Sequence, residues 1–277
     1  MAHHSVTGAQ GVALHVAEHG TDSERAILFI HGWSQAELCW SGQYRSPALT
    51  GYRLLGLDLR GHGMSAKPLT QESYGGEAFA DDIQAVLDRF RLERPILVGW
   101  SYGGFVIGDY VRKYGTARLG GVHFVGAALT LRPIDGATMI WPTFVEHAAK
   151  TASEDLGVVI AHMRPFIRKC TVAAMPAETF ETVLAYNMVT PPAVRGFLIN
   201  RDLDFTAELK ALDRPTLITH GNEDTVVLPS MARFALDHCP SAVASWYEQV
   251  GHAPFMEAPE RFNAELAAFA AEVWSAS

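Results

Sequence analysis

Short apolar runs, each followed by a polar or glycine-rich stretch, recur along the first half of the chain. Runs of this length predict β-strands, because a buried strand needs only about four to eight apolar residues. The predicted strands cover residues 12–17, 26–31, 52–58, 95–98 and 121–127. A turn-forming stretch, Gly20-Thr21-Asp22-Ser23, separates the first two strands, so we expect them to form a hairpin.

Segments with helical periodicity alternate with these strands. Phe79, Ile83 and Val86 recur at spacings of three and four residues within residues 78–90, which indicates one buried helix face. A second helix is expected to begin after Gly103 and to end near Tyr114. Because strands and helices alternate, the pattern predicts an α/β protein whose mostly parallel sheet has helices on both faces.

The strand pattern stops between residues 131 and 209, where methionine, aromatic residues and helix formers dominate. We expect prolines to divide this segment into short helices, at Pro133, Pro142, Pro165, Pro176, Pro191 and Pro192. Strands at 215–220 and 242–248 and helices at 229–238 and 259–274 then resume the earlier alternation. The sequence therefore predicts a core of residues 1–130 and 210–277 with a helical cap inserted at residues 131–209.

Charge and composition narrow the range of partners. The formal net charge is -8 and no cluster of Lys and Arg reverses it locally, which disfavours nucleic acid or an anionic membrane surface as a partner. No run of about 18 apolar residues or basic leader pattern occurs, so we expect a cytoplasmic protein without membrane association. The three widely separated cysteines are expected to be reduced thiols. None of these features predicts the oligomeric state.

A serine occupies the turn of a strand–turn–helix pattern between residues 95 and 114. The apolar run is followed by Gly99-Trp100-Ser101-Tyr102-Gly103-Gly104, and a helix begins there. Glycines on both sides allow the strand and the helix to pass close together, while the serine adopts a strained conformation with its hydroxyl exposed. This arrangement is a nucleophile elbow.

Two later loops supply the base and the acid that a serine nucleophile needs. Asp224 follows the strand at 215–220, and His252 follows the strand at 242–248. The chain order Ser101, Asp224, His252 is the one expected when these groups stand on successive strand ends of an α/β-hydrolase sheet. Glu223 is an alternative acid, but its position in the loop favours Asp224.

Five motifs, each at a predicted strand end, resemble those of α/β-hydrolase-fold serine hydrolases. They are His31-Gly32-Trp33, Asp58-Leu59-Arg60-Gly61-His62-Gly63, Gly99-Trp100-Ser101-Tyr102-Gly103-Gly104, Gly221-Asn222-Glu223-Asp224 and Gly251-His252, so that the resemblance covers nearly everything outside the cap. It implies that Ser101 attacks a carbonyl, that His252 transfers the proton and that Asp224 orients the imidazole. The backbone N–H groups of Trp33 and Tyr102 are then the oxyanion donors.

The same resemblance implies that Asp58, His31 and His62 brace loops. A serine at the elbow argues against dehalogenation and epoxide opening, which use aspartate there, and favours acyl chemistry. We therefore expect hydrolysis of a small, fairly apolar carboxylic ester or lactone through an acyl-enzyme. Trp33 resembles the corresponding residue of small aryl esterases and of cofactor-free haloperoxidases or perhydrolases. Alternatives are a peroxide-dependent activity, hydrolysis of a carbon–carbon bond and a non-catalytic ligand receptor on the same fold.

Neither a metal nor a cofactor is expected, because the sequence has no His-Glu-x-x-His motif, no phosphate-binding loop and no G-x-G-x-x-G. The cap is expected to set substrate choice. Its larger apolar side chains could line an acyl or aryl pocket or could equally pack the cap onto the core: Met139, Trp141, Phe144, Phe166, Phe180 and Met188.

Overall fold

The computed structural model describes residues 1–134 and 136–275, and within them the chain forms an eight-stranded sheet. The strand order is β1-β2-β4-β3-β5-β6-β7-β8. The strands are β1 (Ala2–Thr7), β2 (Ala13–Gly20), β3 (Ala26–Ile30), β4 (Arg53–Asp58), β5 (Ile96–Trp100), β6 (Gly121–Val125), β7 (Thr216–Gly221) and β8 (Ala242–Tyr247). The six strands β4, β3, β5, β6, β7 and β8 are parallel to one another. Strand β2 is antiparallel to both of its neighbours, β1 and β4.

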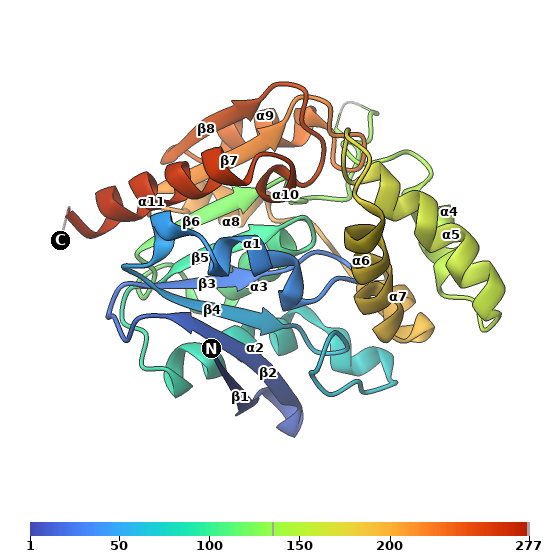
Figure 1. The fold of residues 1–277 in the computed structure, drawn as a ribbon, viewed down its shortest axis with the longest axis horizontal. Helices are drawn as coiled ribbons and strands as arrows, with labels where there is room; N and C mark the ends of the chain where they lie inside the picture. Colours follow the sequence, from blue (N-terminus) through green and yellow to red (C-terminus); the bar gives the residue numbers. More distant parts are fainter. Residues whose placement is uncertain (135, 276–277) are drawn as a thin grey trace.

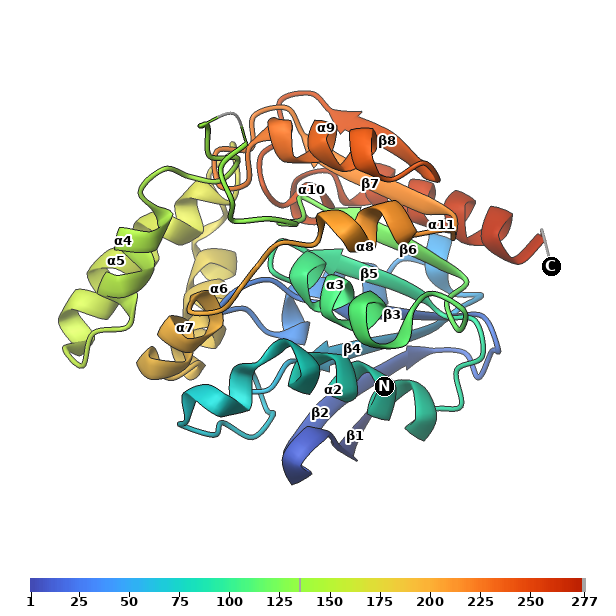
Figure 2. The same ribbon diagram turned by 180° about the vertical axis from the view of Figure 1, so that it is seen from behind.

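Helices cover both faces of the sheet, as the alternating pattern predicts. One face carries α2 (Gly76–Arg89), α3 (Gly103–Tyr114), α8 (Thr206–Ala211) and α9 (Pro229–His238) (Figure 2). The other carries α1 (Ser41–Tyr44), α10 (Pro254–Glu257) and α11 (Pro259–Ser275) (Figure 1). Short 3-10 turns lie at η1 (Ala9–Gly11), η2 (Glu37–Trp40), η3 (Pro47–Leu49) and η4 (Gln71–Tyr74). Strands β3, β5 and β6 are fully buried and form the centre of the core.

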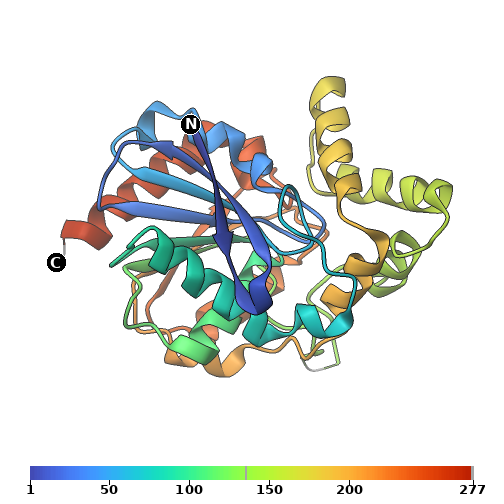
Figure 3. The same ribbon diagram turned by 90° about the horizontal axis from the view of Figure 1, so that it is seen from below.

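Four helices of the segment predicted as a cap lie to one side of the core, beyond the ends of the parallel strands (Figures 1 and 3). They are α4 (Phe144–Thr151), α5 (Leu156–Lys169), α6 (Ala177–Val189) and α7 (Pro192–Ile199). Helix α8 also begins inside residues 131–209, but it contacts α3 and α9 of the core. The prediction that Pro165 breaks a helix is wrong, because α5 continues through it. The exposed ring there costs one intrahelical hydrogen bond without ending the helix.

The predicted hairpin of residues 12–17 and 26–31 is also wrong. Strand β2 pairs with β1 and β4, whereas β3 lies between β4 and β5. All five residues of β3 are buried, so this strand needs a neighbour on each side. Strand β1 was missed because Val6 is its one buried residue, which leaves no apolar pattern to read.

No helix in the described ranges is long and apolar enough to cross a membrane.

Candidate active site

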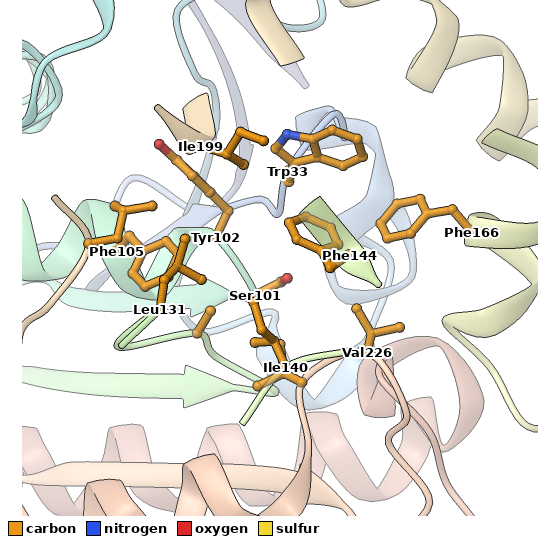
Figure 4. A pocket seen from close by; sticks show the side chains of 13 residues that line it. Trp33, Ser101, Tyr102, Phe105, Leu131, Ile140, Phe144, Phe166, Ile199 and Val226 are labelled. Carbon is orange, nitrogen blue, oxygen red and sulfur yellow. The ribbon is translucent and has the colours of Figure 1, made fainter. Parts of the chain in front are cut away.

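Ser101 stands between β5 and α3, where the sequence predicts an elbow. Its φ is 54°, a left-handed conformation that is strained for a residue with a side chain. A Cβ at Gly99 would lie 2.7 Å from Ile107 Cδ1, and one at Gly103 would lie 2.6 Å from the Ile30 carbonyl oxygen. Only glycine therefore fits on either side of the serine. This conformation directs the Ser101 side chain into a pocket beneath the cap (Figure 4).

His252 and Asp224 meet at the carboxyl ends of β7 and β8. His252 Nδ1 donates a hydrogen bond to Asp224 Oδ2 at 2.7 Å, and both side chains are buried. The second carboxylate oxygen accepts the N–H groups of Val226 at 2.8 Å and Val227 at 3.0 Å, which fixes the carboxylate plane. Among the described residues, His252 Nε2 has no hydrogen-bond partner. This nitrogen is therefore free to accept a proton.

One contact holds the His252 backbone next to the elbow, and a second histidine lies beside Asp224. The indole of Trp100, the residue before Ser101, donates to the His252 carbonyl oxygen at 2.8 Å. The buried His220 lies 3.4 Å from Asp224 Oδ2 but donates to the Val227 carbonyl oxygen at 2.9 Å. Burial lowers the pKa of His220, so this ring is neutral and leaves the Asp224 charge facing His252. Glu223, the alternative acid, is exposed.

The loop of residues 31–35, here called the Trp33 loop, passes directly beside the serine. A Cβ at Gly32 would lie 3.0 Å from Ser101 Cβ. Neither the Trp33 nor the Tyr102 backbone N–H donates to another group within the described chain. Two free N–H groups at this position can stabilise a developing oxyanion.

His31 and Asp58 brace the loops around the site. His31 Nδ1 donates to the Gly32 carbonyl oxygen at 2.8 Å, and its Nε2 accepts the Leu59 N–H at 3.1 Å. Asp58 accepts the N–H groups of Glu37 and Met64, both at 2.8 Å. The contacts of His31 with Leu59 and of Asp58 with Glu37 join the segment after β3 to the segment after β4.

A carboxylate also links the His252 loop to the cap. Glu257 in α10 accepts the Gly251 N–H at 2.8 Å through one oxygen. Through the other it accepts the Val172 N–H, which follows α5, at 2.7 Å. The residue before His252 and the cap are thus bound to the same side chain.

The pocket around Ser101 is lined mainly by apolar and aromatic side chains from both core and cap, and among the described residues no charged side chain belongs to this lining. Phe144 and Phe166 belong to the lining, whereas the other four cap residues named from the sequence do not. The lining residues that sequence reasoning missed include Phe105, Leu131, Ile140, Ile199, Leu203, Val226 and Val227. Figure 4 shows Ser101 among Tyr102, Ile140 and Phe144. Val226 and Val227 could have been predicted as lining residues, because they follow Asp224 almost directly in the sequence.

Comparison with known proteins gives consistent matches. The family model described as "Alpha/beta hydrolase family" matches residues 27–265. A putative aryl esterase from Burkholderia cenocepacia superposes with a TM-score of 0.93 and 33% identity over 99% of this chain and 100% of its own. Esterase RhEst1 from Rhodococcus sp. ECU1013 superposes with a TM-score of 0.88 and 30% identity, again over 99% and 100%. A non-heme haloperoxidase from Rhodococcus erythropolis is 27% identical over 95% of this chain and 98% of its own. The fold predicted from the sequence is confirmed.

Proposed function

This chain belongs to the alpha/beta hydrolase family, and on that premise we propose that it is a serine hydrolase acting on a small, fairly apolar carboxylic ester or lactone. The reaction passes through an acyl-enzyme and uses no metal or other cofactor. The observation that carries the proposal is the 2.7 Å hydrogen bond between His252 Nδ1 and Asp224 Oδ2, in a chain whose predicted nucleophile Ser101 has the strained backbone of an elbow. Such a pair fixes the imidazole tautomer whose Nε2 can act as a base.

In acylation, Ser101 Oγ attacks the carbonyl carbon and its proton passes to His252 Nε2. The negative charge on the carbonyl oxygen is stabilised by the N–H groups of Trp33 and Tyr102. Asp224 stabilises the imidazolium that forms. When the tetrahedral intermediate collapses, the bond to the leaving alkoxide breaks and the alkoxide takes the proton from His252. Deacylation repeats these steps with water as the nucleophile.

The substrate class follows from the pocket and the relatives. The described lining is apolar and aromatic, which favours a neutral, apolar acyl or aryl group over a charged one, because an ion would lose its hydration among these side chains. Two similar solved structures are described as esterases. We expect a small-molecule substrate and, from composition alone, a cytoplasmic location.

The decisive experiment replaces the nucleophile. Ser101→Ala should lower kcat/KM for p-nitrophenyl butyrate by about 10⁴-fold or more, because Oγ forms the covalent intermediate. A fluorophosphonate probe should label the wild type at Ser101 and leave the variant unlabelled. Ser5→Ala, an exposed serine on β1, is the matched control and should keep wild-type activity. Full turnover by the Ser101 variant would contradict the proposal.

A peroxide-dependent activity is the second candidate, and it is favoured by the haloperoxidase relative. In this reaction hydrogen peroxide replaces water in attacking the acyl-enzyme, so that a peracid leaves and Ser101 is regenerated. Peracid formation from acetate and peroxide should be compared with ester hydrolysis in the same preparation. A peracid rate above the hydrolysis rate, lost in Ser101→Ala, would make this activity the main one.

A further inference from the structure

Arg195 in α7 is fully buried, yet no carboxylate pairs with it within the described residues. Its guanidinium makes three hydrogen bonds. Nε donates to Ser34 Oγ at 3.0 Å, one terminal nitrogen donates to the Thr151 carbonyl oxygen at 3.0 Å, and the other donates to the Asn187 carbonyl oxygen at 2.8 Å. A buried cation needs compensation, because its loss of hydration is costly.

Two helix ends supply that compensation. Thr151 is the last residue of α4, and Asn187 lies in the last turn of α6. Carbonyl groups in the last turn of a helix lack intrahelical donors and carry the negative end of the helix dipole. Burial lowers the pKa of Arg195 to about 10, so the group remains a cation at neutral pH. Arg195 therefore fastens α4 and α6 to α7.

The same side chain also reaches the Trp33 loop. Ser34, which accepts from Arg195, is fully buried and has a φ of 61°. That conformation is disfavoured for serine, so contacts from outside the loop must hold it. Ser34 Oγ in turn donates to the Asn187 carbonyl oxygen at 3.2 Å. The Trp33 indole donates to the Arg195 carbonyl oxygen at 3.2 Å, so both Trp33 and Ser34 are bound to the cap.

We propose that Arg195 is a positioning residue that couples the cap to the oxyanion donor at Trp33. By holding Ser34, the guanidinium fixes the direction of the preceding Trp33 N–H relative to the acyl oxygen on Ser101. A donor of this kind contributes only when it is held in place before the reaction, and a small displacement lowers the rate. The inference rests on the proposed function. It adds that the cap controls the rate of the chemical steps as well as the choice of substrate.

If Arg195 only stabilised the cap and did not position Trp33, its variants would show different kinetics. Loosening such a brace would reduce the number of correctly folded sites or weaken substrate binding, and each remaining site would turn over at the normal rate. Loss of positioning instead lowers kcat at every site. Active-site titration with a fluorophosphonate probe separates the two, because kcat is then expressed per titrated Ser101.

The test uses Arg195→Met and Arg195→Lys with p-nitrophenyl acetate and butyrate. Arg195→Met should lower kcat per titrated site about 30-fold while KM changes less than about threefold, since one oxyanion donor is worth about 100-fold or more when removed outright. Arg195→Lys keeps the charge but lacks the planar guanidinium that donates in three directions, so its kcat per titrated site should fall about fivefold. Arg168→Met is the matched control, because Arg168 is an exposed cap arginine that lies over the Phe180 ring. Its kcat should stay within twofold of the wild type.

A double-mutant cycle identifies the route of the coupling. Ser34→Ala alone should lower kcat about tenfold, and it should add less than twofold in the Arg195→Met or Arg195→Lys background, because residues acting through one contact are not additive. If Arg195→Met does not fold, the cycle with Arg195→Lys carries the test.

Wild-type kcat per titrated site in Arg195→Met, or independent losses from Ser34 and Arg195, would overturn the inference. These outcomes differ from failure of the proposed function, in which the wild type itself would neither hydrolyse esters nor be labelled at Ser101.

Discussion

Two fully buried arginines, one in the core and one in the cap, are compensated in different ways. Arg60 forms a two-pronged ion pair with Asp82, with Nε···Oδ2 and Nη2···Oδ1 both at 2.7 Å. Arg195 has hydrogen bonds to two helix-end carbonyl groups and to Ser34 instead. The first pair joins a loop of the core to α2, whereas the second set of contacts joins the cap to the Trp33 loop.

This difference separates what stabilises the protein from what sets its rate. A formal ion pair within the core compensates its charges locally and needs nothing from the cap. Arg195 depends on three helices and one loop being in place together. We therefore expect changes around Arg60 to affect folding alone, and changes around Arg195 to affect turnover.

The largest expected effect tests the reacting groups that the core supplies. Asp224→Asn should lower kcat about 10⁴-fold, because the amide favours the wrong tautomer of His252. The factor should be the same for acetate and for longer acyl esters, since no cap contact changes. Steady-state kinetics measure it, with the exposed neighbour variant Glu223→Gln as a control expected within twofold of wild type. A loss that varies with acyl length would break the division between core and cap.

The next effect concerns the core ion pair. Asp82→Asn leaves the Arg60 charge buried without its partner and should lower the free energy of unfolding by about 3–5 kcal/mol. Activity per titrated site should not change. Urea unfolding checks the first value, and Asp81→Asn, which removes a surface contact to Lys113, should cost only about 0–1 kcal/mol. Equal losses in the two variants would contradict local compensation in the core.

The smallest expected effect concerns Glu37, a buried carboxyl group of the core whose ionised form is destabilised by burial. Burial, and then the nearby Asp58, raises the pKa of Glu37 to about 7 from 4.5. Between these values the folded protein binds a proton that the unfolded chain releases, so stability falls as pH rises through this range. Glu37→Gln should therefore match the wild type near pH 4.5 and be about 3 kcal/mol more stable at pH 8, because one pKa unit corresponds to about 1.4 kcal/mol.

Urea unfolding at both pH values measures this difference. Glu178→Gln, an exposed change in the cap, should follow the wild type at both. A Glu37→Gln advantage that persists unchanged at pH 4.5 would point to packing and not to the buried charge.

Most of the core could be predicted from sequence because its signals are local. The glycines around Ser101 encode the elbow, and the polar loops after β7 and β8 encode the positions of Asp224 and His252. Strand β1 could not be predicted in this way, since Val6 alone is buried and the strand is defined by its pairing with β2. The triad and the cap boundaries stay predictions, and the variants of Ser101 and Asp224 test the triad.

The cap offers few such signals. Which aromatic residues face Ser101 depends on how each helix is rotated, and spacing alone does not separate Phe166, which lines the pocket, from Phe180, which does not. Arg195 was missed because its partners are mostly backbone carbonyl groups, at Thr151 and Asn187, which leave no mark in the side-chain pattern.

The Glu257 bridge has a consequence for protein engineering. Its carboxylate binds Gly251, next to the proposed base, and Val172 in the cap. A chimera that exchanges residues 131–209 for the cap of another family member would keep this bridge only if the new segment after α5 brings a backbone N–H to the position of Val172; otherwise one Glu257 oxygen would lose its donor. Successful recombination should therefore transfer the segment after α5 together with the residue facing it at position 257.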